Sequence, residues 1–239
     1  MRGEVHMHIF LNTFHLFLVA TLLTLKLTIV STILGSGIGL IFAFFRLSRI
    51  KVLNYIANLY ITVIRGTPLI VQIAILYFGL SSIITLSQFW AGAIALGVHS
   101  GAYIAEIFRG SIQSIDRGQM EAARSLGMSQ PLAMRRIVLP QAFKIAIPTL
   151  GNQFIIGLKD SSLVAYVGMQ DLWGAGLSEA ASNFEQMNTY IVVGLYYLAL
   201  VLIITFGVKK LEDSFDVSRD KKRKIRKNKS NASLGSIKL

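Results

Sequence analysis

Residues 118–140 read GQMEAARSLGMSQPLAMRRIVLP and form a polar, charged interruption in an otherwise apolar chain. Residues 121–126 are rich in helix-forming side chains. Gly127 can adopt the left-handed conformation that ends a helix, and Pro131 suits the first turn of the next one. The segment therefore predicts a short helix that faces water, a glycine turn, and a second helix that leads back into the apolar part of the chain.

The composition of the whole chain is that of an integral membrane protein. Of its 239 residues, 53% are hydrophobic and only 15% are charged, whereas a soluble domain is nearer a quarter charged. Several apolar runs reach about twenty residues, enough to cross a hydrocarbon core ~30 Å thick. The chain has no cysteine, which excludes disulfides and thiolate metal sites.

The apolar runs predict an all-α integral membrane fold with five spans in one helical domain. The spans cover approximately residues 16–45, 68–86, 89–108, 145–167 and 190–208. We expect Thr67 as the N-cap and Pro68 as the first helical residue of the second span, because that position needs no amide donor. Residues 53–64 either lie in the membrane interface or extend this span.

The distribution of lysine and arginine predicts which side of the membrane each loop faces. With the N-terminus outside and five spans, 21 of the 24 Lys and Arg residues fall inside, Arg2 falls outside, and Lys26 and Lys159 lie within spans. This strong positive-inside bias places residues 109–144, which include the opening segment, in the cytoplasm. Residues 170–188 carry three acids and no base, and are placed outside.

The predicted layout has three parts. Residues 1–15 form an extracytoplasmic segment, residues 16–215 form the transmembrane domain, and residues 216–239 form a basic cytoplasmic tail that we expect to be disordered. The basic run at 221–227 could in principle bind nucleic acid. Directly after a final span, however, such a run is typical of a tail attracted to anionic lipid. We therefore expect membrane lipid, and no nucleic acid, as its partner.

The spacing within residues 118–140 resembles the cytoplasmic coupling loop of ATP-binding-cassette (ABC) importer permeases. The matching positions are Glu121, Ala122, Ala123, Gly127, Ile137, Leu139 and Pro140. Further stretches are similar to the polar amino acid branch of these permeases: RGTPLIVQ at 65–72, AYIAEIFRG at 102–110, GQ at 118–119, LPQA at 139–142 and LKDSSL at 158–163. The likeness covers about residues 16–215, and an ordinary amphipathic loop helix would not explain so many matches together.

The resemblance implies the permease subunit of an importer that moves a polar amino acid into a bacterial cell across its inner membrane. It also implies a second permease subunit, identical or related, together with two ATPase subunits inside and an extracytoplasmic binding protein. The chain has no Gly-x-x-x-x-Gly-Lys-Ser/Thr loop. ATP and Mg are therefore expected only in the ATPase, and we expect no cofactor, metal site or catalysis in this chain.

A chain without an ATP site needs a surface through which it receives energy, and the coupling segment supplies one. A short helix in such a loop can dock in a groove on a soluble partner. Ala122 and Ala123 allow close approach, while Glu121 and Arg124 can pair with charges on the ATPase. The glycine-rich stretch at 35–39 lies within the first span, where small residues four apart let helices pack closely.

Polar residues within spans are the candidates for the substrate path, because charge is costly there and usually functional. Asp160 is the first candidate, since its carboxylate could meet a substrate ammonium group. Gln153 and Gly157 share a helical face with Asp160 by their spacing, and Ser161 follows directly. The alternatives for Asp160 are a salt bridge to Lys26 or a position at the end of the span that faces water.

The other candidates lie on the second and third spans. Gln72 is either a ligand or a helix–helix hydrogen-bonding residue. Glu106 is either a gate or ligand, or a structural partner of Arg109 one turn away. His99 with Ser100 is more typical of a packed polar pair than of a ligand.

Other functions remain as alternatives to an amino acid importer. The same kind of machine could carry another solute, such as an osmolyte or methionine, but the stretches after Arg65 and around Glu106 favour amino acids. A channel would not need the coupling segment. A membrane hydrolase would need a paired base and nucleophile or a metal cluster in the spans, and the sequence has neither. Glutamine, basic amino acids and cystine are all compatible with one intramembrane carboxylate.

Overall fold

The computed structural model describes residues 2–215, with the surroundings of side chains from residue 13 onward. All regular secondary structure in this part of the chain is helical, which confirms the predicted all-α class. The elements are α1 (Arg2–Leu47), α2 (Lys51–Gly66), α3 (Leu69–Ala74), η1 (Ile75–Gly79), α4 (Gln88–Gln113), α5 (Arg117–Ser125), α6 (Gln130–Ala133), η2 (Met134–Val138), α7 (Leu139–Asp160), η3 (Ser161–Val167), α8 (Leu172–Asn183) and α9 (Gln186–Phe215). The predicted tail at 216–239 lies outside the described residues.

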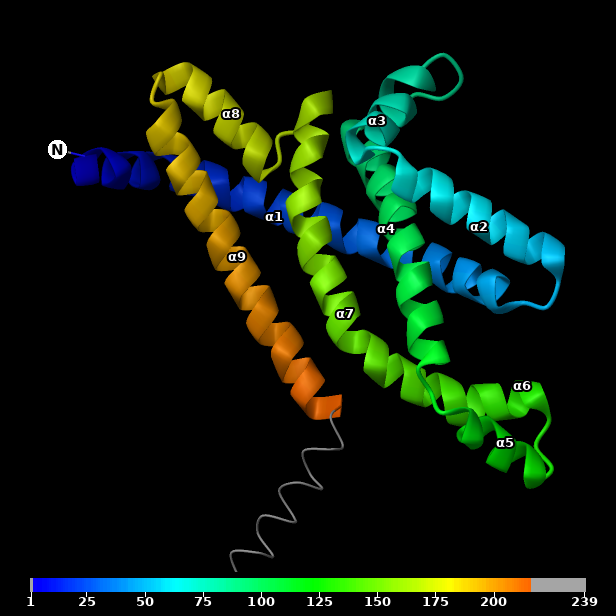
Figure 1. Ribbon diagram of the computed structural model, residues 1–239. Helices are drawn as coiled ribbons and strands as arrows, with labels where there is room; N and C mark the ends of the chain where they lie inside the picture. The colour runs from blue at the N-terminus through cyan, green and yellow to red at the C-terminus, as the bar shows by residue number, and fades with distance from the viewer. Residues whose placement is uncertain (1, 216–239) are drawn as a thin grey trace, which may run out of the picture.

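Helix α1 crosses α9, α7 and α4 in turn (Figure 1). Its 46 residues begin at Arg2, so the helix includes most of the N-terminal segment that the sequence separates at residue 15. The crossing with α4 is close because glycines face each other there. A Cβ added to Gly35 would collide with the Ser100 hydroxyl, and one added to Gly39 would lie 2.6 Å from the Ile104 side chain. The stretch at 35–39 is therefore a helix-packing seam, as the sequence predicts.

Within the described residues, three helical segments are long and apolar enough to cross a membrane: Thr13–Leu47, Gln88–Gln113 and Gln186–Ser214. A fourth crossing is possible only if α2 and the α3–η1 segment form one span that is bent by 103°. Helix α7 corresponds to the fourth predicted span and would be ~33 Å long at ~1.5 Å per residue. Its polar side chains, however, make it less apolar than the three segments above. The count of five spans stays a prediction.

The second predicted span, residues 68–86, is wrong as a single helix. The helical segment after the bend ends at Gly79, and Pro68 is its N-cap rather than its first helical residue. Thr67 instead ends α2, with an extended backbone of φ −117° and ψ 143°. A proline disfavours the helical conformation of the residue before it, so Pro68 itself forces this break.

The start of the short helix α8 is anchored to α1 by a buried polar network. Asp171 is fully buried and accepts a hydrogen bond of 3.1 Å from the Gly174 amide at the start of α8. The next amide, that of Leu172, donates to the Thr24 hydroxyl of α1 at 3.0 Å. Burial raises the pKa of the Asp171 carboxyl to about 6. The network fixes α8 at the end of the molecule opposite α5 and α6 (Figure 1).

Candidate functional site

A small cavity lies where α1, α4 and α7 meet. Its volume is about 60 Å³, which leaves room for a few water molecules. Its lining consists of Ser31, Thr32, Ser36, Leu96, His99, Ser100, Ile104, Leu150, Gln153, Phe154, Gly157 and Asp160. Pockets that enclose small-molecule ligands usually measure ~300–1,000 Å³. The cavity is therefore closed in this conformation and would have to widen to admit a solute.

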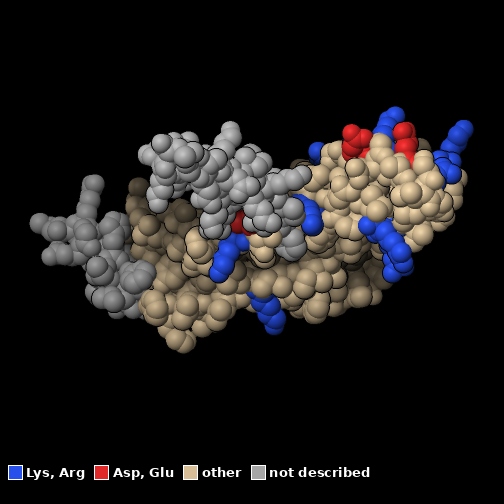
Figure 2. All heavy atoms as spheres, turned by 90° about the horizontal axis from the view of Figure 1, so that it is seen from below, with Lys and Arg blue, Asp and Glu red and all other residues tan. Residues whose placement is uncertain are grey.

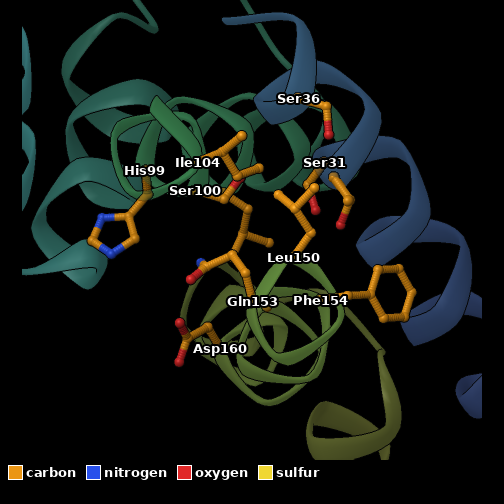
Figure 3. A pocket seen from close by; sticks show the side chains of 12 residues that line it. Ser31, Ser36, His99, Ser100, Ile104, Leu150, Gln153, Phe154 and Asp160 are labelled. Carbon is orange, nitrogen blue, oxygen red and sulfur yellow. The ribbon is translucent and has the colours of Figure 1, made fainter. Parts of the chain in front are cut away.

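The polar residues of α7 that the sequence places on one face lie together in this cavity. Gln153, Gly157 and Asp160 all line it, as helical spacing requires. Figure 3 shows His99 and Asp160 on one side of the cavity, while Ser31 and Ser36 of α1 lie on the other. A carboxyl group, an imidazole and several hydroxyls thus surround one small space, a set that suits a polar solute with a cationic group.

His99 takes its position from Gln72, which does not itself line the cavity. The Gln72 amide nitrogen donates to the Ile64 carbonyl at 2.9 Å and to the Thr67 hydroxyl at 2.9 Å, which closes the bend between α2 and α3. Its amide oxygen is then the atom 3.2 Å from His99 Nδ1. An amide oxygen only accepts hydrogen bonds, so Nδ1 carries the proton and a neutral His99 keeps Nε2 as an acceptor.

The other two predicted path residues lie outside the cavity lining. Glu106 accepts hydrogen bonds from Arg109 at 2.8–3.1 Å and lies 3.5 Å from Arg46 Nε at the end of α1. Of the two alternatives for Glu106, this geometry fits the structural ion pair with Arg109, to which Arg46 adds a second positive charge. The Ser161 hydroxyl is fully buried and donates to the Leu158 carbonyl at 2.7 Å. Both side chains already have partners within the chain.

The alternative of a salt bridge between Lys26 and Asp160 does not occur in the described part of the chain. The Lys26 ammonium instead lies 5.3 Å from the centre of the Phe89 ring, in cation–π geometry. Asp160 is half-buried at the cavity. Its carboxylate therefore has no oppositely charged lysine from α1.

The coupling segment folds as its spacing predicts. Helix α5 is capped by Asp116, whose carboxylate accepts a 2.6 Å hydrogen bond from the Gly118 amide. Gly127 has φ +83°. The amides of Gly127 and Met128 bond back to the carbonyls of Arg124 and Ala123 at 3.0 and 3.2 Å, which is the Schellman arrangement that ends a helix. The predicted helix and glycine turn are confirmed.

The outer face of this segment is open, and its inner face is packed. Glu121, Ala122 and Arg124 are exposed, whereas Ala123 is only 4% exposed. Seen from this end, charged side chains of both signs gather over the coupling segment (Figure 2). Leu126, just before the glycine, is 84% exposed. Leu126 is not among the coupling residues predicted from the sequence, although a leucine in a polar turn beside a helix-ending glycine is a signal that could have indicated an exposed contact residue.

The inner face joins α5 to the helices that line the cavity. A buried cluster of Ile112, Val138 and Ala142 connects α4, η2 and α7, and Met120 of α5, Met134 and Leu139 pack against it. Ile137 is half-buried, and its carbonyl accepts a 2.9 Å hydrogen bond from Gln141. Pro140 has no amide to donate, and a π-helical turn at Met134–Val138 ends two residues before it. Motion of α5 would therefore reach α4 and α7 through packed side chains.

Comparison with known proteins gives consistent relatives. The family model described as "Binding-protein-dependent transport system inner membrane component" matches residues 35–217. The arginine transport system permease protein ArtQ of Bacillus subtilis (strain 168) is 38% identical over 192 residues, which are 80% of this chain and 88% of that protein. The glutamine transport system permease protein GlnP of Escherichia coli (strain K12) is 36% identical over 193 residues, with the same two coverages of 80% and 88%.

Solved structures give the same picture. A crystal structure of an amino acid ABC transporter with histidines aligns with a TM-score of 0.81 at 38% identity, over 85% of this chain and 96% of that one. An inward-facing structure of the MetNI methionine ABC transporter aligns with a TM-score of 0.74 over 85% and 98% of the two chains, but at only 21% identity. The second likeness shows the fold alone.

Proposed function

Because the chain belongs to the family of binding-protein-dependent transport system inner membrane components, we propose that it is the permease subunit of an ABC importer for a polar amino acid. It is a multi-pass protein of the bacterial inner membrane. Relatives named as arginine and glutamine permeases, at 36–38% identity, support the substrate class. A methionine or osmolyte importer is the weaker alternative, since the methionine transporter is similar only in fold.

One structural observation supports the proposal independently of the similar proteins. The buried cluster of Ile112, Val138 and Ala142 connects an exposed helix, α5, to the two helices that line the polar cavity, α4 and α7. The chain has no phosphate-binding loop of its own. An external ATPase that binds α5 would therefore have a direct mechanical connection to the cavity.

The partners and the mechanism follow from this arrangement. Two ATPase subunits, which hold ATP and Mg, bind the coupling segments of two permease subunits in the cytoplasm. When ATP closes the ATPases together, α5 moves with them and biases a bundle that has two stable arrangements. An extracytoplasmic binding protein delivers the amino acid while the cavity is open outward. Asp160 would receive the substrate ammonium, and the unprotonated Nε2 of His99 would accept a further hydrogen bond.

The role of Asp160 can be tested in proteoliposomes that contain the assembled transporter and its binding protein. The substitution Asp160→Asn removes the charge but keeps the shape, and we expect at least a tenfold loss of uptake of labelled arginine or glutamine. Glu212→Gln makes the same chemical change at an exposed position on α9, away from the cavity, and should leave uptake unchanged. Normal uptake by Asp160→Asn would show that the Asp160 carboxylate does not bind the substrate.

The coupling role has its own test. Replacing Glu121 by Ala should abolish transport and weaken binding of the ATPase, while insertion into the membrane stays intact, because Glu121 is exposed and supports no buried packing. Transport that proceeds without any ATPase would contradict the proposal as a whole.

The proposed orientation, with the N-terminus outside, can be mapped directly because the chain has no native cysteine. Ser182→Cys in the last turn of α8 and Ser125→Cys at the end of α5 both place a thiol at an exposed position. A membrane-impermeant maleimide should label the first in intact cells and the second only after permeabilisation. The reverse pattern would invert the orientation.

A further inference from the structure

The turn between α8 and α9 holds an aromatic residue in an unusual backbone conformation. Phe184 has φ 57° and ψ 15°, the left-handed region. Among the described residues it is the one non-glycine residue with positive φ. Its side chain is also 87% exposed. A left-handed conformation costs free energy for any residue with a Cβ, and such strain persists where the surrounding structure enforces it, often at binding sites.

The neighbouring side chains enforce this conformation. The Asn183 amide oxygen accepts a 2.7 Å hydrogen bond from the Glu185 backbone amide. Its amide nitrogen donates to the hydroxyl of the fully buried Thr189 at 3.1 Å and to the Glu179 carboxylate at 3.2 Å. Asn183 thus ties the end of α8 to the first turn of α9. The chain must turn sharply at Phe184, and the ring projects away from the protein.

Helix α8, which leads into this turn, is tightly packed. Gly176 of α8 packs so closely on α9 that an added Cβ would lie 2.7 Å from the Val193 side chain. Leu172 and Ala175 are buried against Phe17 of α1 in the same cluster. With its N-terminus fixed by Asp171, α8 has little freedom to move. Phe184 is therefore presented in a fixed position, as a preorganised contact would be.

The surroundings of the ring are polar and acidic. No Lys or Arg occurs between residues 160 and 208. Glu179 and Glu185 flank Phe184, and Ser182, Asn183, Gln186 and Asn188 are also polar, while Met187 is a second exposed apolar side chain in the turn. Such a segment is poorly suited to the hydrocarbon core, where polar groups lose their hydration. The turn between α8 and α9 lies at the end of the molecule opposite the coupling segment (Figure 1), and its polarity favours water around the exposed ring.

We propose that residues 179–187, here termed the α8–α9 turn, form a docking contact for the extracytoplasmic binding protein. Phe184 enters an apolar pocket on that protein, and basic side chains around the pocket face Glu179 and Glu185. Aromatic anchors contribute most to protein–protein affinity when a polar rim surrounds them, and opposite charges steer the encounter. The inference rests on the proposed function and specifies where one of its partners binds.

The substitution Phe184→Gly separates docking from folding. Glycine adopts the left-handed backbone without penalty, so the thermal unfolding midpoint of the purified subunit should stay equal or rise. The assembled transporter is placed in nanodiscs, and its rate of ATP hydrolysis is measured as the concentration of the binding protein is increased. The binding protein used is the amino-acid-binding protein of the source organism that stimulates the wild-type transporter. We expect the half-stimulating concentration to rise about tenfold or more. Phe184→Tyr, which keeps a ring, should stay within about threefold of wild type.

A matched control is Ile83→Ala in the turn after η1, at the same end of the molecule (Figure 1) and 83% exposed. It should leave the half-stimulating concentration unchanged, and an equal rise there would overturn the assignment to the α8–α9 turn. Glu185→Gln should reduce the salt dependence of stimulation, because it removes one partner charge. If Phe184→Gly lowers the unfolding midpoint and leaves the half-stimulating concentration unchanged, the ring stabilises the fold rather than docking the partner, and the inference fails.

These outcomes are distinct from a failure of the proposed function. If no amino-acid-binding protein stimulates the wild-type complex, the importer assignment itself is wrong. If the wild type is stimulated and Phe184→Gly responds identically, the importer assignment stands and only the docking contact is refuted.

Discussion

Substitution of Gly35 by alanine should destabilise the fold far more than the same change two residues later. A Cβ on Gly35 would collide with the Ser100 hydroxyl, which can rotate, but it would also lie 2.9 Å from the Gly97 carbonyl oxygen and 3.3 Å from the Gly101 amide, which cannot. Helices α1 and α4 would have to separate by a few tenths of an ångström. Overpacking of this kind costs about 1–3 kcal/mol.

At Gly37 an added Cβ would meet nothing within 4 Å, and alanine is favoured over glycine in a helix by up to about 1 kcal/mol. That gain is the same at both positions and cancels, so the two variants, identical in composition, should differ by about 1–3 kcal/mol, the cost of overpacking at Gly35. For a chain of this size, about 1 kcal/mol shifts the unfolding midpoint by roughly 2–4 °C. Thermal unfolding of both variants in the same detergent should show a midpoint for Gly35→Ala that is lower by roughly 2–12 °C.

A third variant locates the clash. Removing the hydroxyl with Ser100→Ala should rescue Gly35→Ala only in part, because the Gly97 carbonyl remains in the way. Complete rescue would mean that the backbones of α1 and α4 are further apart at Gly35 and Gly97 than in this structure. Equal midpoints for Gly35→Ala and Gly37→Ala would refute the reasoning that backbone contact at this seam holds α1 against α4.

Three further predictions concern other parts of the chain. Gly127→Ala places a Cβ at φ +83°, a cost of about 1–2 kcal/mol, and should weaken ATPase binding measured by co-purification without lowering the amount of inserted protein. Gly151→Ala, whose Cβ would collide with Val208 of α9, should lower the unfolding midpoint, whereas Gly157→Ala meets nothing within 4 Å and should not. For Asp171, burial raises the carboxyl pKa to about 6, so the folded chain holds this proton more tightly than the unfolded chain, and its contribution to stability falls as pH rises from about 4 to 6. Asp171→Asn keeps the helix cap but removes this titration, and its unfolding midpoint should depend less on pH over that range; an identical pH dependence would contradict the assignment.

Features determined by local chemistry were predictable from the sequence. The glycine turn at Gly127 follows from backbone sterics, and the pairing of Glu106 with Arg109 follows from helical spacing. The second arginine on Glu106 was not predictable, because Arg46 lies on another helix. The break at Pro68 was available from sterics, since a residue before proline avoids the helical region, but the apolar run around it suggested one continuous span.

Features determined by tertiary contacts were missed. His99 reads as a packed polar residue until Gln72, 27 positions earlier, is seen to fix its tautomer while closing the α2–α3 bend. Phe184 carries no sequence signal for positive φ, because that conformation depends on Asn183 reaching the buried Thr189. The proton position on His99 and the backbone conformation of Phe184 both depend on a side chain from another element.

The two helices that connect the coupling segment to the cavity differ in stiffness, and this difference has a mechanical consequence. Helix α4 is continuous from Gln88 to Gln113 and contains no proline. A displacement of Ile112 is therefore transmitted with little bending to His99, which lies ~20 Å away along the helix. Helix α7 contains Pro148 between its coupling end and its cavity residues. Proline removes a helical hydrogen bond and favours a kink at that point.

A common displacement of α5 would therefore move the cavity face of α4 as a rigid rod, while α7 could bend at Pro148 and change the angle of its Gln153–Asp160 face. Packed interiors resist compression and repack between discrete arrangements. Separation of these two faces is the change that a cavity of about 60 Å³ needs in order to admit an amino acid. The bend thus gives the importer a way to convert motion at the coupling segment into widening of the cavity, rather than into translation of the whole bundle.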